Sequence, residues 1–308
     1  MKRILVLLSS YNGQNYIKEQ LESICSQTGV KVDIQIRDDG STDNTVDVIN
    51  NFVTRYNKKK ENDKHGYCSS ITLTIGENIG YKKSFMELVY CCSKEYDYYA
   101  FADQDDIWLN NKLLEAQKKL ENYDNTPALY YGMMTQVDAN LNKLKEQQQY
   151  RPPLDKHMIL FQNFVQGSTI VFNKKLLQIA QKYKLSKEVA HDVWLPILAR
   201  YFGEVIGDSN SYILYRKHAD AVTVKMRNNY WKELIYQIFR GNKVDNFSLY
   251  LLKGYTTELD QEDLTFLKKI ADYKNNKIFL LKNSNVKKYS FKGTVLLKLS
   301  IIFNRLEN

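Results

Sequence analysis

The stretch FADQDDIW runs from Phe101 to Trp108 and follows directly on an apolar, β-prone run that begins at Tyr98. Three carboxylates stand where the predicted strand ends: Asp103, Asp105 and Asp106. Carboxylates this close repel one another unless a cation binds between them. Their oxygens suit Mg²⁺ or Mn²⁺, which keep water ligands and share positions with substrate phosphates. The alternative is an acidic turn that caps a helix beginning at Lys112.

Upstream of this stretch, short apolar runs alternate with segments whose apolar residues recur at helical spacing, such as Ile17, Leu21 and Ile24. This alternation predicts βαβ units around a parallel sheet. The predicted strands are Ile4–Leu8, Val32–Ile36, Ile71–Ile75 and Tyr98–Ala102. Ligands of open α/β sheets bind at the carboxyl ends of the strands. Four polar clusters should therefore share one crevice: Ser9–Asn12, Asp38–Ser41, Asn78–Gly80 and Asp103–Asp106.

The remainder of the chain has a less regular pattern. Further strands are predicted at Ala128–Met134, Ser168–Phe172 and Ser211–Tyr215, and helices at Lys175–Tyr183 and His191–Phe202. From Met226 onward the sequence reads as mostly helical. We therefore expect a first domain of residues 1–222 and a helical C-terminal region of residues 223–308.

The net charge of +9 is concentrated in that C-terminal region, where 16 Lys and Arg stand against 8 Asp and Glu. Val286–Leu306 mixes apolar residues with lysines and predicts a basic amphipathic element on an anionic membrane surface. An ordinary surface helix packed on the domain is the alternative. Four cysteines without C-x-x-C spacing, no signal-peptide core and no membrane-spanning run predict a cytoplasmic protein, peripheral on the inner face of the bacterial plasma membrane.

Seven motifs in this order resemble the family 2 glycosyltransferases of bacterial envelope polysaccharide synthesis, and among them the rhamnosyltransferase-like members. They are SSYNGQNYIKEQLESICSQ, IRDDGSTDNT, NIGYKKSF, FADQDDIW, GSTIVFN from Gly167, HDVWL from His191 and YRKH from Tyr215. The resemblance implies the α/β GT-A (Rossmann-like) fold, a mixed and mostly parallel sheet flanked by helices. It also implies an inverting mechanism, a dTDP- or UDP-sugar donor and a divalent cation, Mg²⁺ or Mn²⁺.

The donor side of the site is predicted from the first two strand ends. Ser9, Ser10 and Tyr11 are expected to hold the nucleoside base and ribose. Asp38 can accept the imide N–H of uracil or thymine, and Asp39 can face the ribose hydroxyls. A helix cap is the alternative role for this acidic pair.

The donor's diphosphate is expected at the third and fourth strand ends. Asn78 and Gly80 would let the backbone approach it, and Lys82 or Lys83 would neutralise it. Asp103 and Gln104 complete the donor set.

The resemblance assigns the metal to Asp105 as the more direct ligand, together with Asp103. His218, in YRKH, resembles the late histidine of the family near the diphosphate or metal, and a structural role is its alternative. Asp106 and Trp108 are expected to orient the loop and to wall the sugar pocket.

Asp192 is the predicted catalytic base, because inversion needs a carboxylate that takes the proton of the acceptor hydroxyl. A cap for the helix to Phe202 is its alternative role. Gly167, His191 and Trp194 are expected with Trp108 on the acceptor side.

The resemblance implies transfer of L-rhamnose from dTDP-rhamnose to a lipid-linked saccharide. The lack of the Q-x-x-R-W signature of processive synthases favours transfer of a single sugar. A UDP-hexose donor and a non-catalytic sugar-nucleotide or nucleic-acid binding module are the alternatives. A nucleotidyltransferase would need a Gly-rich basic loop after the first strand, and a dehydrogenase would need G-x-G-x-x-G there. No nucleic-acid partner is expected.

Overall fold

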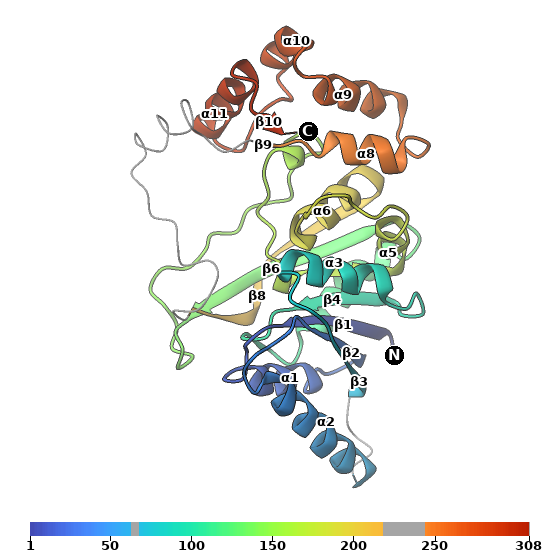
Figure 1. Cartoon of the computed structure of the whole chain (residues 1–308), viewed down its shortest axis with the longest axis vertical. Coiled ribbons are helices and arrows are strands. Elements are labelled where there is room, and N and C mark those ends of the chain that lie inside the picture. The colour runs from blue at the N-terminus through green and yellow to red at the C-terminus, as the bar shows by residue number, and fades with distance from the viewer. Residues whose placement is uncertain (63–67, 218–243, 308) are drawn as a thin grey trace. The chain divides into compact units, whose positions relative to one another are not determined.

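The computed structural model describes residues 1–62, 68–217 and 244–307, and Figure 1 shows the elements in chain order. The chain divides into two compact units, which are described here one at a time. The first holds Met1–Pro153, Val165–Ala199 and the strand that follows Gly203. The second holds Leu154–Phe164, Arg200–Phe202 and the C-terminal helices. Two short segments that we expected in the first domain thus group with the C-terminal region.

The first unit is built on one mixed, eight-stranded sheet with the order β3-β2-β1-β4-β7-β6-β8-β5 in the part of the chain that is described. Its strands are β1 (Arg3–Ser10), β2 (Lys31–Asp38), β3 (Cys68–Ile75), β4 (Tyr98–Ala102), β5 (Ile107–Trp108), β6 (Ala128–Val137), β7 (Val171–Asn173) and β8 (Glu204–Arg216). Strands β3, β2, β1 and β4 are parallel, β7 is antiparallel to both of its neighbours, and β6 is parallel to β8.

Helices cover both faces of the sheet because its central strands are apolar on both faces. The helices of this unit are α1 (Ile17–Cys25), α2 (Thr45–Asn62), α3 (Tyr81–Cys91), α4 (Lys112–Leu120), α5 (Lys174–Ala180) and α6 (His191–Phe202), with 3₁₀ turns η1 (Glu121–Tyr123) and η3 (Gly167–Thr169). Figure 1 shows α1 and α2 on one side of the strands and α3 and α5 on the other.

The two faces are packed differently. On one, Ile4, Val6 and Leu8 of β1 join the apolar residues of α1, α2 and α4 in one buried cluster. On the other, the Phe85 ring of α3 meets Phe101 of β4 edge to face, with ring centroids 5.7 Å apart. Each fully buried side chain of this size contributes about 1.5–3 kcal/mol. The strand ends are therefore held by packing on both sides.

Two predicted strands differ from the structure. The strand expected at Ser168–Phe172 is wrong in its first half: Gly167–Thr169 forms the turn η3, and only Val171–Asn173 pairs in the sheet. The Thr169 hydroxyl donates to the Gln166 carbonyl at 2.8 Å, a local bond that competes with sheet pairing.

The strand expected at Ser211–Tyr215 is longer, because β8 begins at Glu204. The polar residues at its centre, 208–211, are typical of a loop in sequence. In the structure the pairing register of β8 on β6 shifts there. Asp208 is buried and accepts a hydrogen bond from the Tyr130 hydroxyl at 3.2 Å.

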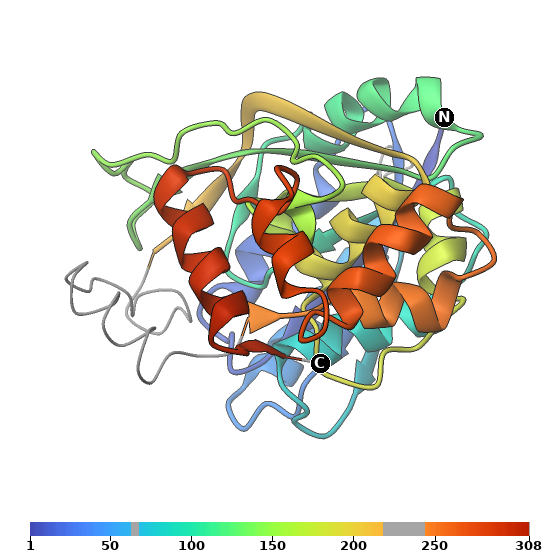
Figure 2. The same cartoon turned by 90° about the horizontal axis from the view of Figure 1, so that it is seen from above.

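The described part of the second unit is mainly helical, as expected for the C-terminal region. It consists of η2 (Met158–Leu160), β9 (Val244–Asp245), α8 (Ser248–Tyr255), α9 (Gln261–Ala271), α10 (Lys277–Lys282), α11 (Phe291–Ile302) and β10 (Leu306–Glu307). Figure 2 shows these C-terminal helices, orange to red, from above. The predicted amphipathic segment Val286–Leu306 contains only α11 as helix, and Leu297 and Ile301 bury one side of it. Among the described residues, no helix combines the length and the apolar character that crossing a bilayer requires.

Candidate active site

The parallel register places the predicted strand ends beside one another. Ser10 at the end of β1 pairs with Asp38 at the end of β2, and Leu8 pairs with Ala102, the residue before Asp103. The polar residues that follow β1, β2 and β4 therefore meet at one edge of the sheet, as the sequence predicts.

Asp38 is fully buried and fixes the turn after β2. Its carboxylate accepts hydrogen bonds from the Ser10 hydroxyl at 2.8 Å and from the Ser41 amide and hydroxyl at 2.8 and 2.6 Å. Gly40 has φ +76° in this turn, and a Cβ there would lie 3.0 Å from the Asn78 amide nitrogen. The structure thus gives Asp38 a role in holding the turn, and its contact with a base stays a prediction.

Asp39 joins the second strand end to the third. It forms an ion pair with Arg37 and accepts from the amides of Ile79 at 3.0 Å and Gly80 at 2.8 Å. Gly80 has φ +83°, and no atom lies within 4 Å of the place where its Cβ would be. Asp39 therefore anchors the turn that is predicted to approach the diphosphate, and the space beside Gly80 is open. Exposed Asn78 accepts from the same Gly80 amide at 3.2 Å.

Gln104 ties the acidic loop to the end of β1. Its side-chain amide accepts from the Tyr11 N–H at 2.8 Å and donates to the Tyr11 carbonyl at 2.9 Å. Tyr11 itself is 44% exposed. A Cβ on Gly13 would lie 2.2 Å from the Gln104 Oε1, so a larger residue there would displace the Gln104 side chain. The neighbouring Ser9 hydroxyl lies 2.6 Å from the Ser84 hydroxyl of α3.

The carboxylates of Asp103, Asp105 and Asp192 lie in one neighbourhood. Burial, together with the negative charges of Asp105 and Asp192, raises the pKa of Asp103 to about 7. Burial also raises the pKa of Asp192 to about 6, against the opposing effects of a backbone hydrogen bond and of the Lys82 ammonium. Asp105 and Asp192, which are 87 residues apart in sequence, thus both act on Asp103, and the charge of Lys82 acts on Asp192.

Asp106 and Lys112 lie beneath the loop. Asp106 is fully buried, and burial followed by the charges of Asp103 and Asp105 raises its pKa, although the Arg216 N–H donates to it at 3.3 Å. The Lys112 ammonium lies 3.5 Å from the centroid of the Trp108 ring, and burial lowers its pKa to about 7. Trp108 is 1% exposed and belongs to the core, so its ring supports the loop from below.

Arg216 was not assigned from the sequence, although it lies in the YRKH motif. It is 4% exposed and donates from Nε to the Asp105 carbonyl at 3.0 Å and from Nη1 to the Ala139 carbonyl at 2.7 Å. Its Nη2 pairs with Glu19 at 2.5 Å. Arg216 is therefore a positioning residue that holds the backbone of the acidic loop.

The three aromatic or imidazole side chains predicted for the acceptor side are buried: Trp108, His191 and Trp194. The His191 ring packs on Phe85 and Phe101, with centroids 4.1 and 4.2 Å away, and burial lowers its pKa to about 3. A Cβ on Gly167 would lie 2.4 Å from the His191 Nε2. As placed, His191 and Trp194 would act on an acceptor only through α6, to which they belong, and Trp108 only through the acidic loop above it.

Lys83 pairs with Glu188 at 2.7 Å, and both side chains are about half exposed. Its predicted contact with the donor remains a prediction, while Lys82 is the lysine whose charge reaches Asp192.

The predicted metal ligands fit a divalent cation in their chemistry. Oxygen ligands from two mutually repelling carboxylates, Asp103 and Asp105, suit Mg²⁺ or Mn²⁺ bound with substrate phosphates and water. Within residues 1–62, 68–217 and 244–307, no group of three or more His, Cys, Asp or Glu side chains is arranged to hold a metal ion. The predicted ligand His218 lies outside the described residues.

Comparison with known proteins places this site in a family. The family model "Glycosyl transferase family 2" matches residues 5–179, more than half of the chain. The chain therefore belongs to glycosyl transferase family 2, as its motifs predict.

Two curated relatives illustrate the family. The dTDP-rhamnosyl transferase RfbG of Shigella flexneri is 28% identical over 298 residues, covering 89% of this chain and 97% of the relative. The UDP-Glc:alpha-D-GlcNAc-diphosphoundecaprenol beta-1,3-glucosyltransferase WfaP of Escherichia coli is 26% identical over 248 residues, covering 77% and 84%.

Solved structures agree with the GT-A fold. TarS 1-349 of S. aureus in complex with UDP-GlcNAc matches with a TM-score of 0.56 at 16% identity, over 92% of this chain and 76% of that one. The mannosyltransferase PcManGT from Pyrobaculum calidifontis, in complex with GDP-Man and Mn²⁺, matches with a TM-score of 0.53 at 13% identity, over 98% and 74%.

Proposed function

We propose that this glycosyltransferase moves one sugar from a nucleoside-diphosphate donor to a hydroxyl of a lipid-linked saccharide, with inversion, in bacterial cell-surface polysaccharide synthesis. The observation that carries the proposal is the common neighbourhood of Asp103, Asp105 and Asp192 at the edge of the sheet where β1, β2 and β4 end. One acidic pair faces the donor's phosphates and a separate acid serves the acceptor.

In this mechanism the acceptor O–H gives its proton to the Asp192 carboxylate as the oxygen attacks the anomeric carbon. The bond from that carbon to the phosphate oxygen breaks, and the nucleoside diphosphate departs with the electron pair. The turn at Gly80 is anchored by Asp39 and has open space beside it, so the backbone there can come close to the diphosphate. A base that takes the proton in the transition state contributes about 10²–10⁴-fold in rate.

Asp105 and Asp103 would hold a divalent cation, with His218 as the further predicted ligand. Such an ion supplies charge stabilisation to the departing diphosphate. The residues of this chain contribute the geometry: Arg216 holds the Asp105 carbonyl, and Gln104 holds the loop to Tyr11.

The proposed donor is dTDP-L-rhamnose, supported by the likeness to RfbG along nearly the whole chain. A UDP-hexose is the second candidate, supported by the likeness to WfaP. A thermal-shift screen of dTDP-, UDP- and GDP-sugars with and without Mn²⁺ separates them, since a ligand stabilises the state that binds it. Stabilisation by UDP-sugars alone would contradict the rhamnose donor.

Turnover tests the base and the reaction. With the preferred donor and a membrane extract as acceptor source, Asp192→Asn should lose activity by about 10²-fold or more while folding normally. Wild-type turnover in that variant would refute the assignment of Asp192. Absence of any transfer by the wild-type protein would instead support the non-catalytic binding module.

A membrane-facing role of the second unit completes the proposal. Helices α10 and α11 and the residues beside them expose several large apolar side chains: Ile278, Tyr289, Phe291, Val295, Ile302 and Phe303. Exposed lysines, such as Lys282 and Lys287, accompany them. Apolar side chains with flanking lysines favour an anionic bilayer surface.

Co-sedimentation with vesicles containing anionic lipid tests this role. The variant Ile278→Ser with Phe291→Ser should bind several-fold less than the control Leu109→Ser with Leu141→Ser, whose exposed side chains lie in the first unit. Equal sedimentation of the two variants would contradict a membrane-facing role of α10 and α11.

A further inference from the structure

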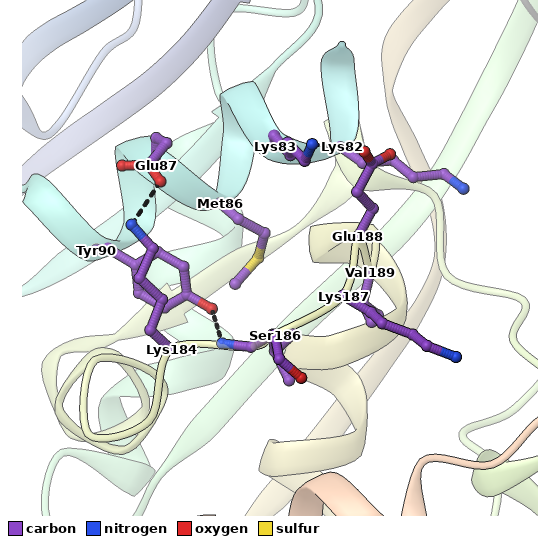
Figure 3. A pocket seen from close by; sticks show the side chains of 11 residues that line it. Lys82, Lys83, Met86, Glu87, Tyr90, Lys184, Ser186, Lys187, Glu188 and Val189 are labelled. Carbon is purple, nitrogen blue, oxygen red and sulfur yellow. Dashed lines mark hydrogen bonds and ion pairs between the residues drawn. The ribbon is translucent and has the colours of Figure 1, made fainter. Parts of the chain in front are cut away.

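A pocket of about 400 Å³ lies between α3 and the segment that leads into α6. One face of α3 lines it with Lys82, Lys83, Met86, Glu87 and Tyr90, and the segment 184–189 lines it from the other side (Figure 3). Its volume is within the range of about 300–1,000 Å³ that is usual for small-molecule sites. The mechanism above leaves this pocket unused.

The pocket is built by specific contacts between its two walls. The Leu185 N–H donates to the Tyr90 hydroxyl at 3.1 Å, Lys184 pairs with Glu87 at 2.7 Å, and Figure 3 shows both contacts as dashed lines. Met86 and Val189 are nearly buried and form an apolar base. The walls are thus held together by the fold before any ligand binds.

The charge of the pocket favours an anion. Four lysines line it against two glutamates, and Figure 3 shows the ammonium ends of Lys82 and Lys187 extending to the same side. The two glutamates are engaged by Lys83 and Lys184 in ion pairs whose partners are partly exposed. Because such pairs are worth about 0–1 kcal/mol, an incoming phosphate can rearrange them at small cost.

The pocket lies close to the proposed base along the chain, because its wall segment 184–189 ends three residues before Asp192. The charge of Lys82 lowers the pKa of both Asp192, the proposed base, and Glu188, in the pocket wall. From Lys82 to Tyr90 the lining face of α3 extends about 12 Å at 1.5 Å per residue. An acceptor with its hydroxyl at Asp192 would then place its following groups toward the pocket along α3.

We propose that this pocket binds the diphosphate group of the lipid-linked acceptor, with Lys184 and Lys187 on one wall and Lys82 and Lys83 on the other. The inference rests on the proposed function and adds the chemical class of the acceptor's anionic group. The same lysines would suit the donor's diphosphate, so the test distinguishes the two sources.

The test compares two acceptors that carry the same saccharide, one on a short-chain alkyl diphosphate and one on a neutral alkyl group. The wild-type protein should show a KM about 10-fold or more lower for the diphosphate acceptor, equivalent to about 1.4 kcal/mol. Lys184→Gln with Lys187→Gln should raise that KM toward the value for the neutral acceptor. The KM of the donor and that of the neutral acceptor should stay within about two-fold, because neither uses these lysines.

Matched variants separate charge from fold. Lys184→Arg with Lys187→Arg should keep the preference for the diphosphate acceptor, and so should Lys119→Gln with Lys175→Gln, which removes two exposed lysines outside the pocket. The preference should also weaken as ionic strength rises. Equal use of both acceptors by the wild-type protein, or a rise in donor KM in the pocket variant, would overturn the inference.

A direct binding arm separates failure of this inference from failure of the proposed function. In the presence of saturating nucleoside diphosphate, titration with the alkyl diphosphate should show binding to the wild-type protein that is lost in the Lys184→Gln, Lys187→Gln variant. Absence of binding to the wild-type protein refutes the pocket assignment. Binding without any sugar transfer supports the pocket and refutes the proposed reaction.

Discussion

Gln104 and Tyr11 exchange two hydrogen bonds that join the acidic loop to the end of the first strand. The amide group satisfies both backbone groups of Tyr11 at once, which no other side chain of similar size except asparagine can do. The pair therefore fixes the distance between the predicted base-binding and phosphate-binding parts of the donor site. Gly13 leaves the space in which the Gln104 side chain lies.

Gln104→Ala should weaken donor binding, because the acidic loop loses its connection to Tyr11. We expect donor KM to rise about 10-fold and stability to fall by about 1–2 kcal/mol, the usual range for two hydrogen bonds. Gly13→Ala should have a similar effect by displacing the Gln104 side chain. In a double-mutant cycle the two changes should be strongly non-additive. Additive effects of the two substitutions on donor KM would show that Gly13 does not act through the Gln104 side chain.

Arg216→Lys should disturb the acidic loop more than loss of its ion pair does. Lysine cannot reproduce the planar fork that contacts the carbonyls of Asp105 and Ala139 together. We expect a loss of about 2 kcal/mol in the free energy of unfolding and a fall in kcat/KM. The matched variant Glu19→Gln removes only the half-exposed charge partner and should cost about 1 kcal/mol or less. Urea unfolding and initial rates check both, and equal costs would contradict the role of the fork.

Lys112→Met should be tolerated or stabilising. The Lys112 ammonium is buried, and within the described chain its nitrogen has no hydrogen-bond partner beyond the face of Trp108. A methionine of similar length removes the desolvation cost and keeps the packing, although it leaves Asp106 without its neighbouring cation. We expect a stability change of no more than about 1 kcal/mol in the unfavourable direction by urea unfolding. A loss of 3 kcal/mol or more would show that the cation stabilises the loop.

His191 should make stability depend on pH. Its folded-state pKa is about 3, whereas an unfolded histidine titrates near 6.5, so the unfolded state binds the additional proton between these values. The stability contributed by neutral His191 is therefore fully present above pH 6.5 and is lost as pH falls. Relative to His191→Phe, the wild-type protein should lose about 2 kcal/mol by pH 5. Parallel pH profiles for the two proteins would show that the ring gains a partner on protonation.

The sequence predicted the strand ends well because two local signals agreed there. Apolar runs end in polar clusters at Ser9, Asp38 and Asp103, and parallel pairing makes such ends coincide. Family motifs predicted Asp192 at the start of a helix, which is where α6 begins. These features depend on short stretches of chain, so a single sequence is sufficient to predict them.

Contacts between distant segments were not predictable in the same way. Nothing local to Arg216 indicates that it holds the Asp105 carbonyl, since the contact depends on the pairing of β8 with β5. His191 and Trp108 were predicted to line the acceptor side, but both are buried in the structure. Their residue types occur in binding sites and in cores equally well, so the sequence alone does not distinguish the two roles. The YRKH motif indicated that this segment belongs to the site, but it does not show that Arg216 is buried or which acceptors its guanidinium contacts.

The short strand β5 has β8 as its partner in the described sheet, through Ile107 with Leu214 and Trp108 with Ile213. On the ribosome, a nascent chain that ends before β8 therefore lacks both the pairing partner of β5 and the Arg216 guanidinium that donates to the Asp105 carbonyl. The acidic loop acquires its final support only when Arg216 has emerged, more than a hundred residues after the loop itself was synthesised. A chain that terminates before that point would contain strands β1–β4 but would lack the contacts that hold the acidic loop, and we expect it to be inactive.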